Sequence, residues 1–277
     1  MTVLNQALTR LFDLAMGPLD RLPPMTGLVL LSLLTAAAVL LAFKWTSDQV
    51  ALVAAKRAMQ AALLEMRLFN DDLAALLRAQ GEVLRHTLSY LRLSLAPTLW
   101  LIVPMLALLL HTEFYFGYMG LATGEPALVR VRLAADAGTK AKALLPASLE
   151  APEAVGVETP GVSLPSEREI VWRIRPRAAG SYELRVHVGG TVLSKTLLVS
   201  DSVSRRSPVR PDTGFLNQLR YPSEPPLPSD SGLAAITIGY PERDFSVVGW
   251  DIGWSGAYLA LTLALALVLR RPFGVVM

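Results

Sequence analysis

The sequence contains no cysteine and only three histidines among its 277 residues. Without cysteine, the chain can form no disulfide bond, zinc–thiolate site or thiol nucleophile. His86, His111 and His187 fall in three separate regions, which argues against a metal cluster or a catalytic triad. No glycine-rich phosphate loop and no basic run interleaved with aromatic residues is present. We therefore expect no cofactor and no metal, and the net charge of only +3 is too small to imply nucleic-acid specificity.

Paired carboxylates are almost as scarce. Asp71 and Asp72 resemble a catalytic pair, but adjacent aspartates at the start of a helix usually cap it and interact with its dipole. No carboxylate or lysine lies inside an apolar run, where it would suggest a proton or ion relay. The sequence therefore predicts a protein that is not an enzyme.

Apolar residues are abundant: they make up 52% of the chain, which is high for a soluble protein. A membrane-spanning helix needs about 20 apolar residues, with a range of roughly 17–25. We predict three spans, at 25–43, 95–112 and 253–269. The sixteen uncharged residues from 95 to 110 also fit a buried core helix. We interpret the first span as a retained anchor, because Lys44 and Trp45 follow it in place of a signal-peptidase site.

Basic residues in short loops mark the cytoplasmic side of a membrane protein. Seven lysines and arginines lie between the first two spans, and Arg270 and Arg271 follow the third. This distribution places residues 44–94 and the tail 270–277 in the cytoplasm, and the N-terminus and residues 113–252 outside. The Ala-, Leu- and Arg-rich composition suggests a bacterial chain, so we expect the bacterial inner membrane.

Helical periodicity dominates the first half of the chain. Residues 1–24 predict an amphipathic helix that lies either in the outer membrane interface or on the protein's own outer domain. Residues 44–94 carry apolar residues at spacings of three and four, interrupted once near Asn70. Two helices joined by so short a turn must fold back on each other. We therefore predict a cytoplasmic antiparallel hairpin whose second arm continues into the second span.

Beyond the second predicted span, the spacing of apolar residues changes to the two-residue alternation of β-strands. Residues 126–136 alternate between apolar and basic, and segments 170–175, 182–188 and 191–199 are predicted to be three short strands, with a tight turn at Gly189 and Gly190. We predict an immunoglobulin-like β-sandwich within residues 113–201, with the alternating arginines on its solvated face. Residues 202–252 are rich in Pro, Ser, Asp and Gly and are predicted to be a linker. The predicted fold is thus an α-helical membrane protein with three spans, a cytoplasmic hairpin and an inserted extracytoplasmic β-sandwich.

Three segments carry a resemblance to a known family. They are FKWTSDQ after the first span, AAKRAMQAALLEMRLFNDD in the first arm, and LRAQGEVLRHTLSYLRLSLAPTLWLIVP from the second arm into its span. This arrangement resembles the YidC/Oxa/Alb superfamily of membrane insertases, and is most similar to the three-span members of archaea and the endoplasmic reticulum. The resemblance implies a polar groove that thins the bilayer, and a hairpin that meets the client protein or the ribosome.

Bacterial members of that family use a groove arginine, and no predicted span of this chain has an arginine in its middle. The resemblance leaves Lys44 and Arg92 as candidates at the groove mouth, with Ser32, Thr35 and Thr98 deeper, although such residues commonly serve only helix packing. Hairpin candidates for contact with a client or partner are Lys56, Arg57, Arg67 and Phe69. The alternative function is an accessory or scaffold subunit of a larger membrane complex, bound through its outer β-domain. A channel is a weaker third hypothesis, because the spans lack a polar lining.

Overall fold

The computed structural model describes residues 10, 12–19, 22–68, 73–134, 147–247 and 249–275. The chain divides into two compact units. The first comprises Met1–Leu28 and Leu109–Ala257 and holds every described strand, whereas the second, Val29–Leu108 and Tyr258–Met277, is helical. Three helices run from one unit into the other: α2 (Pro24–Thr46), α4 (Leu73–Phe116) and α7 (Trp254–Leu269).

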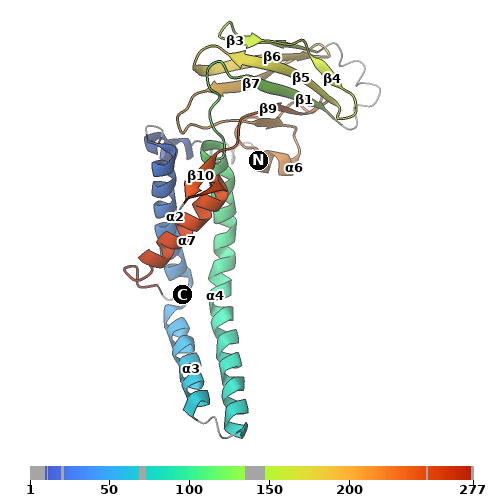
Figure 1. Ribbon diagram of the computed structural model, residues 1–277. Coiled ribbons are helices and arrows are strands. Elements are labelled where there is room, and N and C mark those ends of the chain that lie inside the picture. The colour runs from blue at the N-terminus through green and yellow to red at the C-terminus, as the bar shows by residue number, and fades with distance from the viewer. Residues whose placement is uncertain are drawn as a thin grey trace. The chain divides into compact units, whose positions relative to one another are not determined.

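The β-domain of the first unit contains two main sheets in which all strand pairs are antiparallel. One sheet has the order β3–β5–β1–β9–β8, with β4 also paired to β5, and the other has the order β2–β6–β7. Figure 1 draws these strands as arrows. Their bounds are β1 (Ala127–Leu133), β2 (Ser148–Glu150), β3 (Val155–Val157), β4 (Val162–Leu164), β5 (Glu169–Pro176), β6 (Gly180–Val188), β7 (Thr191–Val199), β8 (Val209–Pro211) and β9 (Leu233–Ile238).

One hydrophobic cluster takes residues from both sheets, so the two sheets share a core. Along β1, buried residues alternate with exposed ones, and Arg130 and Arg132 are on the exposed side. Trp172 on β5 and Leu184 on β6 are among the fully buried side chains. The β6–β7 turn uses Gly189 and Gly190 at φ 57° and 82°, the left-handed values that favour glycine in a two-residue hairpin. The observed domain is therefore a β-structure of antiparallel strands, built on the predicted alternation.

The prediction that residues 202–252 form a linker is wrong. This segment supplies β8, β9 and the short helix α6 (Phe215–Arg220) to the first unit, and β9 lies between β1 and β8. It also forms a small hairpin of β10 (Asp244–Val247) and β11 (Trp250–Gly253). The prediction failed because β9 is a six-residue apolar run among Pro- and Ser-rich turns, and it is stabilised by pairing with a strand about a hundred residues earlier in the chain.

The second unit contains a helical hairpin of α3 (Gln49–Leu68) and the first part of α4. Asp48 caps α3, since its side chain accepts a hydrogen bond of 2.9 Å from the backbone N–H of Ala51. The arms lie side by side (Figure 1), and the Thr87 hydroxyl lies 3.4 Å from the Met59 sulfur. Residues 69–72, including Phe69 and the aspartate pair, lie outside the described residues. The second arm and the second predicted span are one helix, because α4 continues from Leu73 to Phe116.

Two described helices are long and apolar enough to cross a membrane, α2 and the 76–116 part of α4. The third predicted span corresponds to α7, an apolar helix of 16 residues. In the most apolar window of α4 only 6% of the residues are buried, compared with 44% for α2. An uncovered apolar helix is unusual in a soluble protein, so the exposure of α4 supports its placement in lipid or against a partner.

The described part of the N-terminal segment packs on its own unit. The Phe12 and His111 rings stack with centroids 4.8 Å apart, and Asp13 accepts a hydrogen bond from the Tyr115 hydroxyl and pairs with Arg205 at 3.5 Å. Of the two alternatives for this helix, these contacts favour packing on the outer domain. Phe114, Tyr115 and Phe116, at the end of α4, are also buried in the first unit.

Candidate functional site

The two predicted mouth residues have different surroundings. The Lys44 ammonium donates a hydrogen bond of 2.8 Å to the carbonyl oxygen of Phe273, which fastens the turn after α7 to the end of α2. Arg92 is exposed on α4, and the described residues offer it no ion pair. Lys44 therefore has a structural partner, whereas the charge of Arg92 is free to meet another molecule.

The three predicted groove hydroxyls are not brought together. Ser32 and Thr35 on α2 are 0% and 5% exposed, while Thr98 is exposed and donates to the carbonyl of Ser94 in its own helix at 2.7 Å. The Tyr258 hydroxyl on α7 donates a hydrogen bond of 2.9 Å to Thr35 Oγ1. We call the four buried hydroxyl-bearing side chains of α2 and α7 the polar seam: Ser32, Thr35, Tyr258 and Thr262.

Ser32 Oγ has no hydrogen-bond partner among the described residues, although it is fully buried. A buried hydroxyl without a partner costs about 1–3 kcal/mol.

The sequence analysis singled out Ser32 and Thr35 of the polar seam but missed Tyr258 and Thr262. Tyr258 lies within an apolar run. Its hydroxyl could have indicated a polar partner on a neighbouring helix, since a buried tyrosine O–H usually has a partner.

The predicted hairpin contacts lie along α3. Arg57 and Arg67 are exposed and Lys56 is half-buried, whereas Phe69 lies outside the described residues. Arg57 lines a cavity of about 370 Å³ that Gln49 and Gly274 also line. Arg67 lines another of about 610 Å³ with Gln60, Leu63, Leu64 and Met66. Both hollows combine aliphatic side chains with a guanidinium group, which suits binding of a partner more than catalysis.

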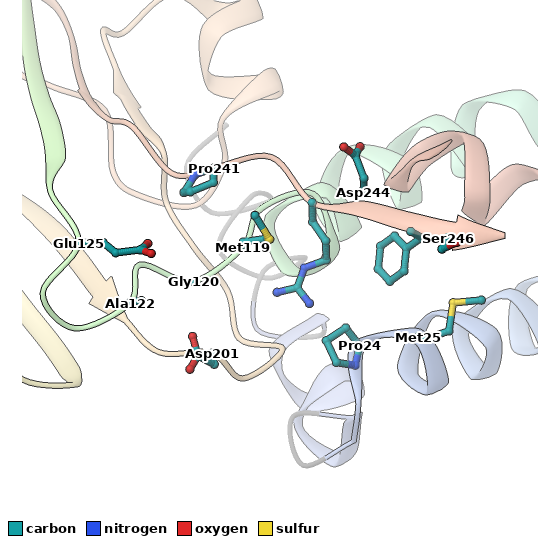
Figure 2. Close-up of a pocket in the computed structure, with 12 residues that line it drawn as sticks. Pro24, Met25, Met119, Gly120, Ala122, Glu125, Asp201, Pro241, Asp244 and Ser246 are labelled. Carbon is teal, nitrogen blue, oxygen red and sulfur yellow. The ribbon is translucent and has the colours of Figure 1, made fainter. Parts of the chain in front are cut away.

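The first unit contains a larger cavity, of about 680 Å³, that the sequence did not suggest. In Figure 2, Glu125 and Asp201 lie on one side of it, and Asp244 and Ser246 on the other. Its apolar lining includes Met25 from the start of α2; the full lining is Pro24, Met25, Met119, Gly120, Ala122, Glu125, Asp201, Pro241, Arg243, Asp244, Phe245 and Ser246.

Among the described residues that line this cavity, Arg243 is the one basic side chain, and it is only 8% exposed. Its Nε and Nη2 donate hydrogen bonds of 3.3 Å to the carbonyl oxygen of Tyr118. Burial lowers the pKa of Arg243, while the charge of Asp201 opposes that shift. Three carboxylates line the cavity with this guanidinium, and its described lining includes no histidine or lysine. This cavity can therefore hold a ligand that has both charged and apolar parts.

A buried ion pair lies elsewhere in the β-domain. The Lys195 ammonium on β7 lies 2.7 Å from Glu224 and donates to the carbonyl oxygen of Ser207 at 2.6 Å. Burial lowers the pKa of Lys195, and the charge of Glu224 opposes that shift. Burial alone would raise the pKa of Glu224, but Lys195 and the N–H of Thr196 lower it below its ordinary value. These contacts tie the segment around Ser207 and Glu224 to β7.

The described residues contain no group of three His, Asp or Glu side chains able to hold a metal ion. Comparisons with models of known protein families, with curated proteins and with solved structures found no match for this chain. The candidate sites are therefore three: the polar seam and the hairpin in the second unit, and the cavity lined by Arg243 in the first.

Proposed function

We propose that this chain is a non-enzymatic membrane-protein insertase or biogenesis factor of the bacterial inner membrane, similar to the YidC/Oxa/Alb superfamily. In this proposal α2, α4 and α7 are three spans. The hairpin and C-terminus lie in the cytoplasm, and the first unit, with an immunoglobulin-like β-sandwich, lies outside. The clients are membrane proteins, and the ribosome is a further candidate partner for the hairpin.

The continuity of α4 carries this proposal. One helix joins a charged hairpin arm to an apolar segment whose surface is largely uncovered, with Trp100 at 78% exposed. A client that meets the hairpin could therefore follow a single helix surface into the bilayer. Moving a polar segment across hydrocarbon is costly because its backbone groups lose water, and a protein surface that offers hydroxyl groups lowers that cost without ATP.

The polar seam is the nearest source of such hydroxyls within the described spans. Tyr258 donates a hydrogen bond to Thr35, and Ser32 is buried three residues earlier on α2. We infer that insertion requires α7 to move from α2, so that a client's backbone groups replace Tyr258 as the partner of Thr35. The cost of exposing the seam to lipid then keeps it closed when no client is present.

The test is insertion into proteoliposomes that contain the purified chain, with a short-tailed single-span client added during translation. We expect a protease-protected client fragment that increases with the amount of the chain. Equal protection in empty liposomes would contradict the proposal.

The matched control fixes α7 to α2. The natural chain has no cysteine, so the double variant T35C/Y258C carries the only two thiols. A tyrosine side chain separates the two backbones by more than a disulfide spans, so the thiols are joined by a short bis-methanethiosulfonate cross-linker that a reducing agent removes. Cross-linked protein should lose insertion, and reduction should restore it to the level of the same variant before cross-linking. Insertion unaffected by the cross-link would contradict the proposed movement of α7.

The alternative is an accessory or scaffold subunit of a larger membrane complex. The cavity lined by Arg243, with its mixed charged and apolar walls, favours this alternative because it provides a binding site whose lining lies mostly outside the proposed spans. Stoichiometric co-purification with one fixed assembly, abolished by Arg243→Ala and not by substitutions in the polar seam, would support the alternative over insertion.

A further inference from the structure

The hairpin part of α4 exposes a row of leucines that nothing in the described chain covers. These residues, the leucine stripe, are Leu77, Leu84, Leu88, Leu91 and Leu95, each between 52% and 62% exposed. They follow one another at intervals of seven, four, three and four residues. Such intervals place them on one face of the helix, in the pattern by which helices pack in coiled coils. Five exposed leucines on one face need an apolar partner in water.

The contact with α3 uses a different face of α4. Ala79 is buried in the hairpin and Thr87 meets Met59 of α3, while Val83 and Tyr90 are half-buried on the same side. Each leucine of the stripe at 84, 88 and 91 lies one residue beyond a residue of this covered face, which is a rotation of about 100° around the helix. The leucine stripe is therefore a second packing surface, additional to the one that forms the hairpin.

A row of arginines runs beside the leucine stripe. Arg78, Arg85 and Arg92 each follow a stripe leucine directly, lie seven residues apart and are exposed. Within the described part of the chain none of the three forms an ion pair. The other flank of the stripe is neutral, with Gln80, Thr87 and Ser94. In coiled coils the flanking positions select the partner by charge, so this row favours a partner with carboxylates.

Lipid does not fit the whole stripe. The stripe from Leu77 to Leu95 extends about 27 Å along a helix that continues into the apolar segment. The polar layer of a bilayer adds only about 5–8 Å on each side of the hydrocarbon core. If the apolar segment spans the membrane, headgroups reach Leu91 and Leu95 but not Leu77. A second copy of the chain fits poorly as well, because it presents neutral residues or arginines, and no carboxylates, at the flanking positions.

We propose that the leucine stripe and the arginines Arg78, Arg85 and Arg92 form a docking site for an amphipathic α-helix of a partner protein. The partner helix buries apolar residues of a heptad repeat against the leucines and places Asp or Glu side chains beside the arginines. This inference rests on the membrane placement in the proposed function, which excludes lipid, but it does not require insertion activity.

The binding test uses the full chain in nanodiscs and two synthetic four-heptad peptides. Both carry leucine at the apolar heptad positions; one has glutamate and the other lysine at the flanking positions. Fluorescence anisotropy should show binding of the glutamate peptide that is at least tenfold tighter and weakens with added salt. The variant R78E/R85E/R92E should reverse this preference, whereas R130E, on the exposed face of β1, should leave it unchanged. Equal binding of the two peptides to the native chain would overturn the proposal.

Gly81 provides a variant that should strengthen binding. It occupies the gap in the stripe between Leu77 and Leu84, and a side chain added there meets nothing within 4 Å. Gly81→Leu should tighten the glutamate peptide several-fold while raising helicity, whereas Leu84→Asp should abolish binding with the hairpin intact by circular dichroism. An unchanged affinity in both variants would contradict the proposal.

The source of the natural partner is tested in cells with a photo-crosslinker at position 88, and at exposed position 89 as the control. The proposal requires a discrete protein adduct from position 88 that is lost in R78E/R85E/R92E. Adducts with lipid alone or with a second copy of the chain would overturn it. Loss of the adduct with insertion intact would leave docking supported and separate from insertion, while absent insertion with the adduct intact would contradict only the proposed function.

Discussion

The hydroxyl of Tyr258 donates a hydrogen bond of 2.9 Å to Thr35 Oγ1, and both side chains are buried between α7 and α2. Tyr258→Phe removes the donor and leaves Thr35 facing a ring edge. We expect the free energy of unfolding to fall by about 0.6–1.5 kcal/mol, the range for hydrogen bonds between membrane helices. Equilibrium unfolding in mixed detergent micelles measures it. The double variant with Thr35→Val should cost little more than either single variant, and full additivity would show that the two hydroxyls do not interact.

Removing the Ser32 hydroxyl is expected to have the opposite effect on stability. Its Oγ is buried without a partner among the described residues, so Ser32→Ala removes a polar atom and no hydrogen bond. We predict that this variant is neutral or more stable by up to about 1 kcal/mol in the same unfolding assay. If insertion requires the seam hydroxyls, Ser32→Ala should at the same time slow client insertion. A loss of stability would show that Ser32 has a partner in the folded protein.

Gly120 lies where no side chain fits. A Cβ added there would stand 1.8 Å from the carbonyl oxygen of Ser200, so Gly120→Ala must displace the backbone beside the cavity lined by Arg243. We expect a loss of about 1–3 kcal/mol in the stability of the first unit, measured by hydrogen exchange of its strands. Gly81→Ala is the matched control: nothing lies within 4 Å of its added Cβ, and it should stabilise α4 by about 0.5–1 kcal/mol. Similar effects of the two substitutions would contradict this reasoning.

The periodicity of apolar residues was sufficient to predict individual strands and helices, but it could not predict which elements pair with one another. Alternation predicted the strands that became β5, β6 and β7, and the Gly189–Gly190 turn between the last two is present. β9 was missed because its six residues gain their stability from β1, a contact that no local pattern reports. The helical stretches were long and periodic, but their pattern could not tell which exposed face meets lipid and which meets protein.

The candidate sites were harder to predict than the elements. Lys195 lies in β7 at the same alternating positions as the buried residues Leu193 and Leu197. Its place in that alternation was the available signal that a charge would be buried and would need a partner. The partner itself, Glu224, lies in a Pro-rich segment whose path no periodicity describes. The cavity lined by Arg243 combines segments from four distant parts of the chain, so only the folded structure brings them together.

The buried pair of Lys195 and Glu224 makes the stability of the β-domain sensitive to acid. Because the pKa of Glu224 is lower in the folded protein than in the unfolded chain, its contribution is fully present above the ordinary glutamate value of 4.5. That contribution is lost as the pH falls through the lower, folded-state pKa, since the unfolded chain then binds the additional proton. Burial disfavours the Lys195 ammonium, so protonating its counterion leaves an unpaired charge in the core. We predict that exchange of the β7 amides, after correction for intrinsic exchange, stays nearly constant from pH 7 to about 4.5 and becomes faster as the pH falls below 4.5.

Two variants distinguish the effect of this ion pair on acid stability from the effect of other carboxylates. Glu224→Gln keeps the size of the side chain but removes the charge, and it should cost about 3 kcal/mol at pH 7 while flattening the acid dependence. The double variant K195M/E224L removes both charges, and it should recover most of that loss because no unpaired charge remains in the core. If K195M/E224L were as unstable as Glu224→Gln, the hydrogen bonds of Lys195 to Ser207 would be the main stabilising contacts. An acid transition in Glu224→Gln as large as in the native chain would assign the pH dependence to other carboxylates.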